Sequence, residues 1–317
     1  MLVLGGAALF GFNASVSKVV LTAGIEPARL TALRCSGAAL GLAAVLAAVA
    51  PSRFAVPRRD LPALALLGLT GAALIQWLYF VAIDRLPVGI ALLLEFTGPL
   101  LVALWARLVQ RQVVPRRVWL ALALSLVGLA MVAQVWRDTG LDPVGVTAGL
   151  GAAACLAAFY LLGKHTLERR EPLTVSFWML TFAALFWAVA QPWWRFDAAV
   201  LGEQASLLGV FERISLPVWM ALAWVVVAGT LLPYALAIAA LGHLSPATTG
   251  VVAMIEPVIA AAVAWVWLGQ TLGALQLAGG ALVLVGVTLV QLVRSDPSDD
   301  RHRRAPIAVD APIPDAS

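Results

Sequence analysis

A succession of apolar segments fills the chain, each close to the roughly 20 residues that a helix needs to cross a bilayer. Of the 317 residues, 62% are hydrophobic and 12% are charged, against roughly a quarter charged in soluble domains. A water-soluble fold could not cover so much apolar surface. The sequence therefore predicts an all-α integral membrane protein with ten transmembrane helices. The predicted spans are residues 2–22, 30–50, 62–83, 87–108, 116–136, 143–164, 173–194, 217–241, 245–267 and 272–293.

Basic residues are unevenly shared between alternate connections, which predicts the orientation of the chain because cytoplasmic loops carry an excess of Lys and Arg. One side holds Arg53, Arg58, Arg59, Arg107, Arg111, Arg116, Arg117, Lys164, Arg169, Arg170, Arg294, Arg301, Arg303 and Arg304. The other side holds Arg29, Arg85, Arg137, Arg195 and Arg213. We expect a multi-pass protein of the cell's inner (plasma) membrane with both termini cytoplasmic.

Two polar segments lie outside the predicted spans. Residues 196–216 read as an outer loop with an amphipathic helix on the membrane surface, because Val, Leu and Phe residues alternate there with polar ones. The tail, residues 295–317, is rich in Pro and Asp with few large apolar residues. It is predicted to be a disordered cytoplasmic tail.

An internal repeat divides the chain. A shift of 158 residues pairs Pro99 with Pro257 without a gap, and a shift of 146 pairs Lys18 with Lys164. The predicted units are residues 1–137 and 143–293. Each holds five spans, an odd number, so the second unit must enter the membrane upside down relative to the first. Inverted repeats of this kind are typical of secondary transporters with a site near the membrane midplane.

Two carboxylates lie within predicted spans. Glu95 is about eight residues, or roughly 12 Å, into the fourth span, and Glu256 is near the middle of the ninth. The repeat aligns Glu256 with Gly98, so both acids fall on about the same helical face. Buried acids in membranes are costly and commonly mark transport pathways. Both are candidates to bind an amine or a proton; the alternative is a neutral acid hydrogen-bonded in the packing.

Lys18, Arg34 and Asn13 are polar residues of the first two spans. The two basic side chains can either reach the membrane surface or face inward, where they would hold a carboxylate or pair with Glu95. Asn13 can hydrogen-bond a ligand or a neighbouring helix.

Pro99 and Pro257 each remove a backbone hydrogen bond and are predicted to kink their helices, which exposes carbonyl groups near the cavity. Further candidates to line that cavity are Gln76, Trp77, Tyr79 and Tyr234. Aromatic residues at helical spacing more often serve packing.

The sequence lacks the motifs of an enzyme or a metal protein. His165, His243 and His302 are isolated from one another, so they form no metal-binding motif. The net charge of +4 is spread over loops and tail rather than on one face, which argues against nucleic acid as a partner. We expect no cofactor and no metal.

The motifs resemble the EamA family of the drug/metabolite transporter superfamily. The resemblance rests on the inverted repeats, on Glu256-Pro257 and on the turn Leu268-Gly269-Gln270. The runs Leu86-Pro-Val-Gly-Ile-Ala and Leu94-Glu95-Phe-Thr-Gly-Pro99-Leu look closest to the threonine/homoserine exporter branch. In the small multidrug branch a Glu stands at the depth of Asn13. The departure argues against export of lipophilic cations through that acid.

The resemblance and the buried charges together predict a secondary transporter that exports a small polar metabolite by alternating access. An amino acid is the favoured substrate, because two acids and two bases near one cavity can hold a zwitterion. Coupling to protons through Glu95 or Glu256 is a hypothesis that rests on their depth in the membrane, and the coupling ion is open; membrane lipid surrounds the helices. The alternatives are a non-transporting membrane sensor or partner protein, and an exporter of another metabolite or drug class. The oligomeric state is open.

Overall fold

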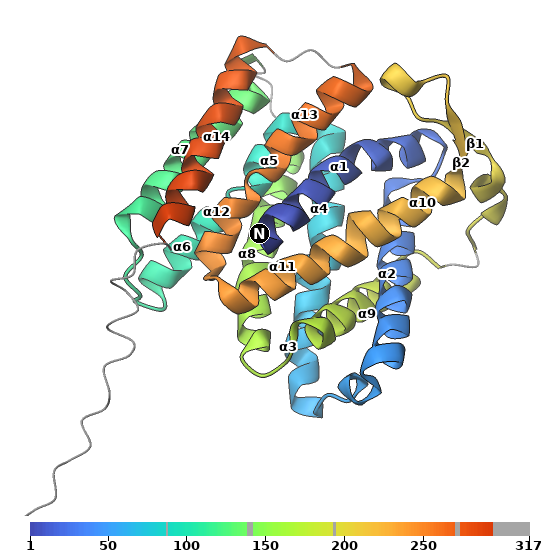
Figure 1. Cartoon of the computed structure of the whole chain (residues 1–317), viewed down its shortest axis with the longest axis horizontal. Helices are drawn as coiled ribbons and strands as arrows, with labels where there is room; N and C mark the ends of the chain where they lie inside the picture. The colour runs from blue at the N-terminus through green and yellow to red at the C-terminus, as the bar shows by residue number, and fades with distance from the viewer. Residues whose placement is uncertain (87, 138–141, 193–194, 270–272, 294–317) are drawn as a thin grey trace, which may run out of the picture.

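The computed structural model describes residues 1–86, 88–137, 142–192, 195–269 and 273–293. Within these ranges the chain is mostly helical (Figure 1). The α-helices are α1 (Leu2–Thr22), α2 (Pro27–Val49), α3 (Leu61–Gly68), α4 (Ile75–Arg85), α5 (Val88–Glu95), α6 (Gly98–Leu108), α7 (Arg116–Ala133), α8 (Pro143–Leu167), α9 (Pro172–Ala190), α10 (Val218–Val226), α11 (Leu232–His243), α12 (Pro246–Ala253), α13 (Glu256–Leu268) and α14 (Ala274–Val293).

The predicted spans coincide with these helices or with pairs of them. Within the described ranges, nine helical segments are long and apolar enough to cross a membrane, and the apolar part of α14, Ala274–Val290, is shorter. The prediction of an all-α, multi-pass membrane protein is confirmed. The count of ten spans stays a prediction. The predicted tail, 295–317, lies outside the described residues.

Two of the spanning segments are broken near their middle. The fourth predicted span divides into α5 and α6, and the ninth divides into α12 and α13. Pro99 and Pro257 are each the second residue of the later helix, where the missing N–H of proline would have no helical partner in any case. The structure thus has an interruption of two residues ahead of each proline, which is more than the bend that the sequence predicted.

Two other segments contain a π-helical turn, in which the backbone hydrogen bonds run over five residues instead of four. One is η3 (Leu69–Leu74), between α3 and α4, and the other is η8 (Val227–Leu231), between α10 and α11. The two π turns start 158 residues apart, and so do α6 and α13. This is the shift that the sequence repeat uses.

The segment between α9 and α10 was predicted to be an outer loop with an amphipathic helix, and the helix part of this prediction was wrong. Its described part forms 3-10 turns and two short antiparallel strands, β1 (Gln204–Ser206) and β2 (Ser215–Pro217). A helix cannot continue through Gly209, whose φ is +56°. The apolar side chains of the segment pack instead on the ends of α1 and α10, and Trp267 Nε1 donates a hydrogen bond to the Leu207 carbonyl oxygen (2.7 Å).

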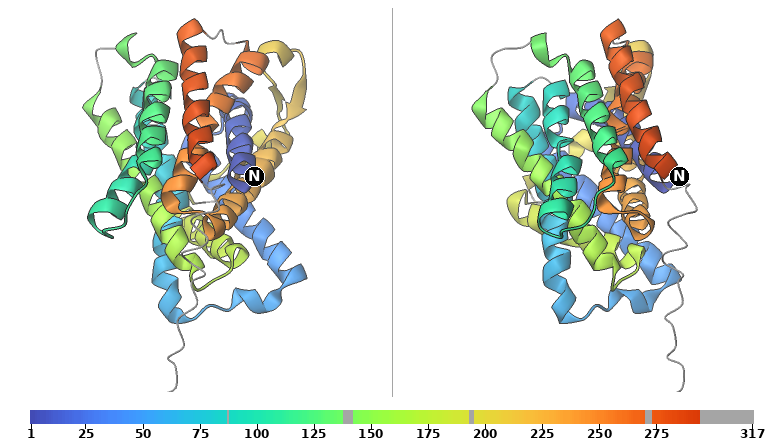
Figure 2. Two further views of the ribbon diagram at one scale, coloured as in Figure 1. Left: turned by 60° about the vertical axis from the view of Figure 1, so that its left-hand side comes forward. Right: turned by 90° about the vertical axis from the view of Figure 1, so that its left-hand side faces the viewer.

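Two helices, α1 and α8, organise the centre of the bundle. Helix α1 packs against α13, α11 and α10, while α8 packs against α4, α5 and α6. Figure 2 shows α1 crossing the molecule beside the later helices of the chain. Segments from the first and second units of the sequence repeat are therefore interleaved. The broken helices lie against α1 and α8.

Helices α7 and α14 form a tight pair at one edge of the molecule (Figures 1 and 2). Gly128 and Gly279 face one another there. A Cβ added at Gly128 would lie 2.6 Å from the Gly279 carbonyl oxygen and 2.9 Å from the Val283 backbone nitrogen. Small residues let helices in membranes approach in this way.

Ion pairs join the α2–α3 connection to the α8–α9 connection. Arg170 donates to one oxygen of Asp60 through Nε (2.8 Å) and Nη2 (2.7 Å). Arg53 pairs with Glu171 at 2.6 Å. Asp60 is buried, so its pair with Arg170 is the better shielded of the two. These contacts hold the first unit of the repeat to the second at this end of the bundle.

The close approach of α7 and α14 predicts opposite outcomes for two glycine substitutions. Gly128→Ala should lower the free energy of unfolding by about 1–3 kcal/mol, because the new methyl group meets backbone atoms that cannot move aside. Gly242→Ala, also in a helix but with nothing within 4 Å, should be neutral or stabilise by up to about 1 kcal/mol. Thermal unfolding in detergent measures both. Equal stability of the two variants would contradict the close approach.

Candidate functional site

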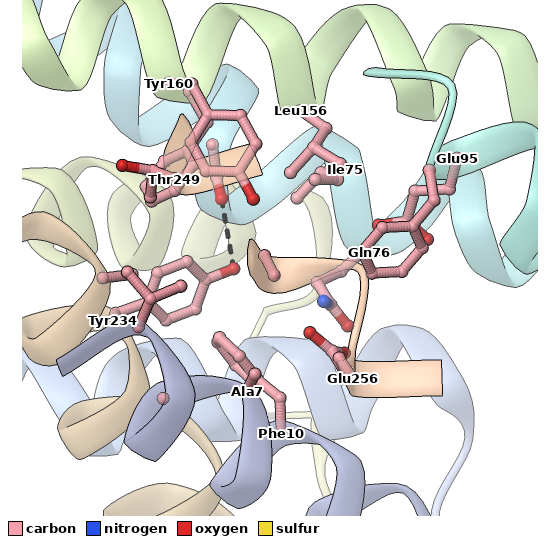
Figure 3. A pocket seen from close by; sticks show the side chains of 17 residues that line it. Ala7, Phe10, Ile75, Gln76, Glu95, Leu156, Tyr160, Tyr234, Thr249 and Glu256 are labelled. Carbon is pink, nitrogen blue, oxygen red and sulfur yellow. Dashed lines mark hydrogen bonds between the residues drawn. The ribbon is translucent and has the colours of Figure 1, made fainter. Parts of the chain in front are cut away.

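Two adjoining cavities run between α1 and the broken helices. Phe10, Gln76, Glu95 and Glu256 line both of them, so these four residues mark the place where the cavities meet. One cavity, of about 80 Å³, extends toward the N-terminal end of α1. The other, of about 290 Å³, extends toward the end of α1 that carries Lys18 and Leu21. Figure 3 shows Glu95 and Glu256 approaching this space from different elements.

One face of α1 lines the whole path. Its lining residues recur every three or four positions, the spacing of a single helical face. They are Val3, Gly6, Ala7, Phe10, Asn13, Ala14, Ser17, Lys18 and Leu21. Most are small or polar, so the cavity stays open along this face. Helix α1 therefore acts as a continuous wall from one end of the path to the other.

Both carboxylates stand at a helix break. Glu95 is the last residue of α5, and Glu256 is the first residue of α13. Each break is held by a close helix contact. A Cβ at Gly98 would lie 2.9 Å from the Ala153 carbonyl oxygen of α8, and one at Gly11 of α1 would lie 3.0 Å from the Glu256 carbonyl oxygen. The local sequence thus fixes where the two acids stand.

Glu95 and Glu256 are half-buried and face the cavity. Within the described part of the chain, neither forms an ion pair or a side-chain hydrogen bond. The alternative that each acid is neutral and hydrogen-bonded in the packing therefore lacks the partners it needs. The structure places both acids in the lining of the same cavities; their role in binding stays a prediction.

The two basic candidates differ in their surroundings. Arg34 is 4% exposed and does not reach the membrane surface. Its guanidinium donates to Thr230 Oγ1 through Nε (2.8 Å), to Gln76 Oε1 through Nη1 (3.1 Å) and to the Gly229 carbonyl oxygen through Nη2 (2.7 Å). Lys18 is exposed and lines the larger cavity. Among the described residues, neither pairs with Glu95.

Three of the remaining candidates also line the path. Asn13 is buried, packs against Gly229 of the π turn η8, and lines the larger cavity together with Tyr79. Tyr234 lines the smaller cavity, and its hydroxyl donates to the Gly71 carbonyl oxygen (3.1 Å, the dashed line in Figure 3). Trp77 does not line either cavity; its side chain is 45% exposed on the outside of the bundle.

Carbonyl groups of the two π turns are thus bound by side chains from the other unit of the repeat. Gly71 O in η3 accepts from Tyr234, and Gly229 O in η8 accepts from Arg34. A π turn breaks the regular backbone pattern, and an unpaired carbonyl in a membrane interior is costly. These two hydrogen bonds supply partners at that place and link the two units at the level of the cavity.

The sequence did not predict several residues that line the cavities. Phe10 lies on the same face of α1 as Asn13, so helical spacing could have identified it. Tyr160 of α8 and Thr249 of α12 line the smaller cavity, and no periodic signal distinguishes them from core residues. The aromatic rings of Phe10 and Phe159 pack on that of Tyr234, with centroids 5.3 and 6.0 Å away.

The described residues hold no group of three or more His, Cys, Asp or Glu side chains that could bind a metal ion. The arrangement is instead that of a multi-pass inner membrane protein whose helices enclose a path lined by two acids that have no ion pair with any described residue. Comparison with known proteins gives the family. The chain belongs to the EamA-like transporter family, whose model matches residues 1–134 and 143–292. Membership in a family of transporters agrees with the prediction that the chain is not an enzyme.

Several similar relatives are named as exporters. The threonine/homoserine exporter RhtA of Salmonella typhimurium (strain SL1344) is 31% identical over 270 residues, which cover 84% of this chain and 83% of the relative. RhtA of Escherichia coli (strain K12) is 30% identical over 274 residues with the same coverage. A probable terminal-alkyne amino-acid exporter of Streptantibioticus cattleyicolor is 30% identical over 260 residues, covering 79% and 81%.

A solved crystal structure of another protein has the same fold. It superposes with a TM-score of 0.70 at 19% sequence identity and covers 92% of this chain and 96% of its own. At this identity the likeness concerns the fold alone.

The path predicts a difference in reactivity between two neighbouring positions of α1. Ala14 is exposed and lines the larger cavity, whereas Ser15 is 2% exposed and lies on another face of the helix. With Cys35 and Cys155 replaced by Ala, Ala14→Cys should react with a water-soluble maleimide at least about tenfold faster than Ser15→Cys, because a thiol reacts only where the reagent can reach it. Mass spectrometry after timed labelling measures both rates. Similar rates would show that the cavity is not open to water.

Proposed function

We propose that this protein is a secondary exporter of a small polar metabolite, with an amino acid as the favoured substrate. The observation that carries the proposal is that Glu95 and Glu256, which form no ion pair with any described residue, line the same cavities. Each stands at a helix break, one in each unit of the repeat. Acids in such a position are costly and seldom persist without a use. The substrate class is supported by three similar relatives, two named threonine/homoserine exporters and one named a probable amino-acid exporter.

The two carboxylates have a direct chemical use. When ionised they attract the ammonium group of a substrate, and when protonated they lose that attraction. Binding of a proton and binding of an amine therefore compete at the same oxygens. A protein that exposes the site alternately to the two sides of the membrane would exchange protons for substrate. The proton gradient is the proposed driving force.

Two inverted five-helix repeats are the proposed architecture. The family model matches the chain twice, and the π turns and helix breaks recur with one shift. Five spans in each unit would reverse the second unit relative to the first. Alternating access then follows if the two units rock against each other about the cavity.

The proposed orientation places both termini in the cytoplasm, because the connections on that side carry the excess of Lys and Arg. The larger cavity, which Lys18 lines, would then face outward. The ion pairs of Asp60 and Arg53 would lie on the cytoplasmic side and hold that side closed. A fluorescent protein or phosphatase fused after residue 317 distinguishes the two orientations. Phosphatase activity at the fusion would contradict the proposed one.

The proposal of proton coupling predicts a selective loss in Glu95→Gln. In proteoliposomes, the variant should lose flux of threonine driven by a pH gradient, because the amide cannot exchange a proton. Exchange of threonine across the membrane at equal pH should remain within about threefold, since the cavity keeps its shape and Glu256 keeps its charge. Radiolabelled uptake into inside-out vesicles measures both modes.

The matched control is Glu26→Gln, at the exposed start of α2, which should leave both modes unchanged. Gradient-driven flux in Glu95→Gln equal to that of the wild type would refute the coupling. A wild-type protein that moves none of a panel of amino acids or other metabolites would favour the alternative of a membrane sensor.

A further inference from the structure

Gln76 stands at the centre of the path. It lies in the first turn of α4 and lines both cavities together with Glu95 and Glu256. Figure 3 shows its amide beside the Glu256 carboxylate, inside the pocket. A group in this position meets any molecule that passes from one cavity to the other.

The amide of Gln76 can have only one orientation. Arg34 Nη1 lies 3.1 Å from its side-chain oxygen, and a guanidinium has donors and no acceptor. The oxygen of the amide must therefore face Arg34, and the NH₂ group must turn away from it. Within the described part of the chain, no protein group accepts a hydrogen bond from Gln76 Nε2. The site thus offers a fixed and unused donor.

Arg34 is held firmly by the other unit of the repeat. It donates to Thr230 Oγ1 and to the Gly229 carbonyl oxygen of the π turn η8, and Thr230 Oγ1 donates in turn to the Val225 carbonyl oxygen (2.7 Å). All three guanidinium nitrogens are thereby engaged. Because the planar guanidinium of Arg34 is held at all three nitrogens, the Gln76 amide that it contacts has little freedom to rotate.

The positive charge of Arg34 has no carboxylate partner among the described residues, although its side chain is only 4% exposed. Arg34 lines the larger cavity together with Glu95 and Glu256, so its charge is compensated only across that space and not by direct contact. An anionic group that enters the cavity beside Gln76 would supply a direct counter-charge, and a buried charge gains most from a partner in contact with it. Glu95 and Glu256 line the same space and suit a cationic group instead.

We propose that Gln76 Nε2 binds the carboxylate of the transported amino acid, and that Arg34 is the positioning residue that orients the Gln76 amide and supplies positive potential behind it. The inference rests on the proposed function. It adds that the substrate must carry a free carboxylate as well as an amine. Gln76 and Arg34 would then recognise the carboxylate, and Glu95 and Glu256 the ammonium group. Simple amines would then bind weakly.

The experiment compares threonine with threoninamide, which keeps the amine and the side chain and lacks the carboxylate. The wild-type protein in proteoliposomes should prefer threonine by at least about tenfold in flux at low concentration, because the amide oxygen of threoninamide accepts a weaker hydrogen bond than a carboxylate and brings no negative charge toward Arg34. Gln76→Glu keeps the shape, removes the amide donor and adds a carboxylate that repels that of threonine, so it should reduce this preference to within about threefold. Trp77→Leu, next in the sequence but outside the bundle, should leave the preference unchanged.

Arg34→Lys tests the positioning role. It keeps the charge but cannot engage three acceptors in the same geometry, so it should also reduce the preference for threonine. Combined with Gln76→Glu it should cause little further loss, because the two residues act through one contact. A purely structural role for Arg34 would lower the transport of both compounds equally and leave their ratio unchanged.

The outcomes separate the two proposals. Transport of threonine and threoninamide that falls equally in Gln76→Glu and in Gln76→Leu, with stability in detergent unchanged, would overturn the carboxylate assignment and leave the exporter intact. A wild-type protein that moves threoninamide as well as threonine would overturn it too. A wild-type protein that moves neither these compounds nor any other amino acid would overturn both the assignment and the proposed function.

Discussion

The contact on which the site depends is the burial of the Arg34 guanidinium between the two units of the chain. Lipid offers no hydrogen bonds, so each polar group inside the bundle needs a partner from the protein. Arg34 meets this requirement with the hydroxyl of Thr230, the Gly229 carbonyl and the Gln76 amide. In doing so it fixes α2 and α4 of the first unit against the π turn of the second. The cavity with its two acids lies directly beside this junction.

A second junction is the hydrogen bond from Tyr234 to the Gly71 carbonyl oxygen. Here the second unit supplies the donor and the π turn of the first unit supplies the acceptor. Each π turn opens its backbone at a point where the opposite unit provides a donor. The helix breaks at Glu95 and Glu256 lie at the same level, lining the same cavities as Gln76. Irregular backbone in a membrane protein is tolerated where it lines a cavity or is buried in protein. Four such irregularities therefore gather around one polar space.

Much of this could be predicted from the sequence. The apolar runs gave the helices because a span in lipid must be long and continuous, and the prolines gave the places where two of them break. The direction of a side chain was harder. Gln76 and Trp77 are neighbours in one span, yet the first faces the cavity and the second lies outside. The π turn just before them contains one residue more than a regular helical turn, which rotates the side chains of the following helix by roughly 100° about its axis. No sequence pattern predicts this turn.

The surroundings of Arg34 were also open to two readings, since a long basic side chain near a helix end can reach the surface. The partners that hold it inside, Gly229 and Thr230, are almost 200 residues away in the sequence. One of them is a backbone carbonyl group, which every residue has, so no residue type in the sequence identifies it. The prediction for the loop after α9 was wrong for a local reason. Its apolar residues suggested a helix, whereas the left-handed Gly209 and the packing on α1 and α10 favoured a short hairpin.

The central claim, that Glu95 and Glu256 share one cavity that holds the substrate, is tested most directly by chemical protection. A carbodiimide should modify both carboxyl groups in the purified protein, and threonine in the medium should slow the modification of both to a similar degree, as measured by peptide mass spectrometry. Modification of either acid at a rate that substrate does not change would place that acid outside the substrate cavity and contradict the account.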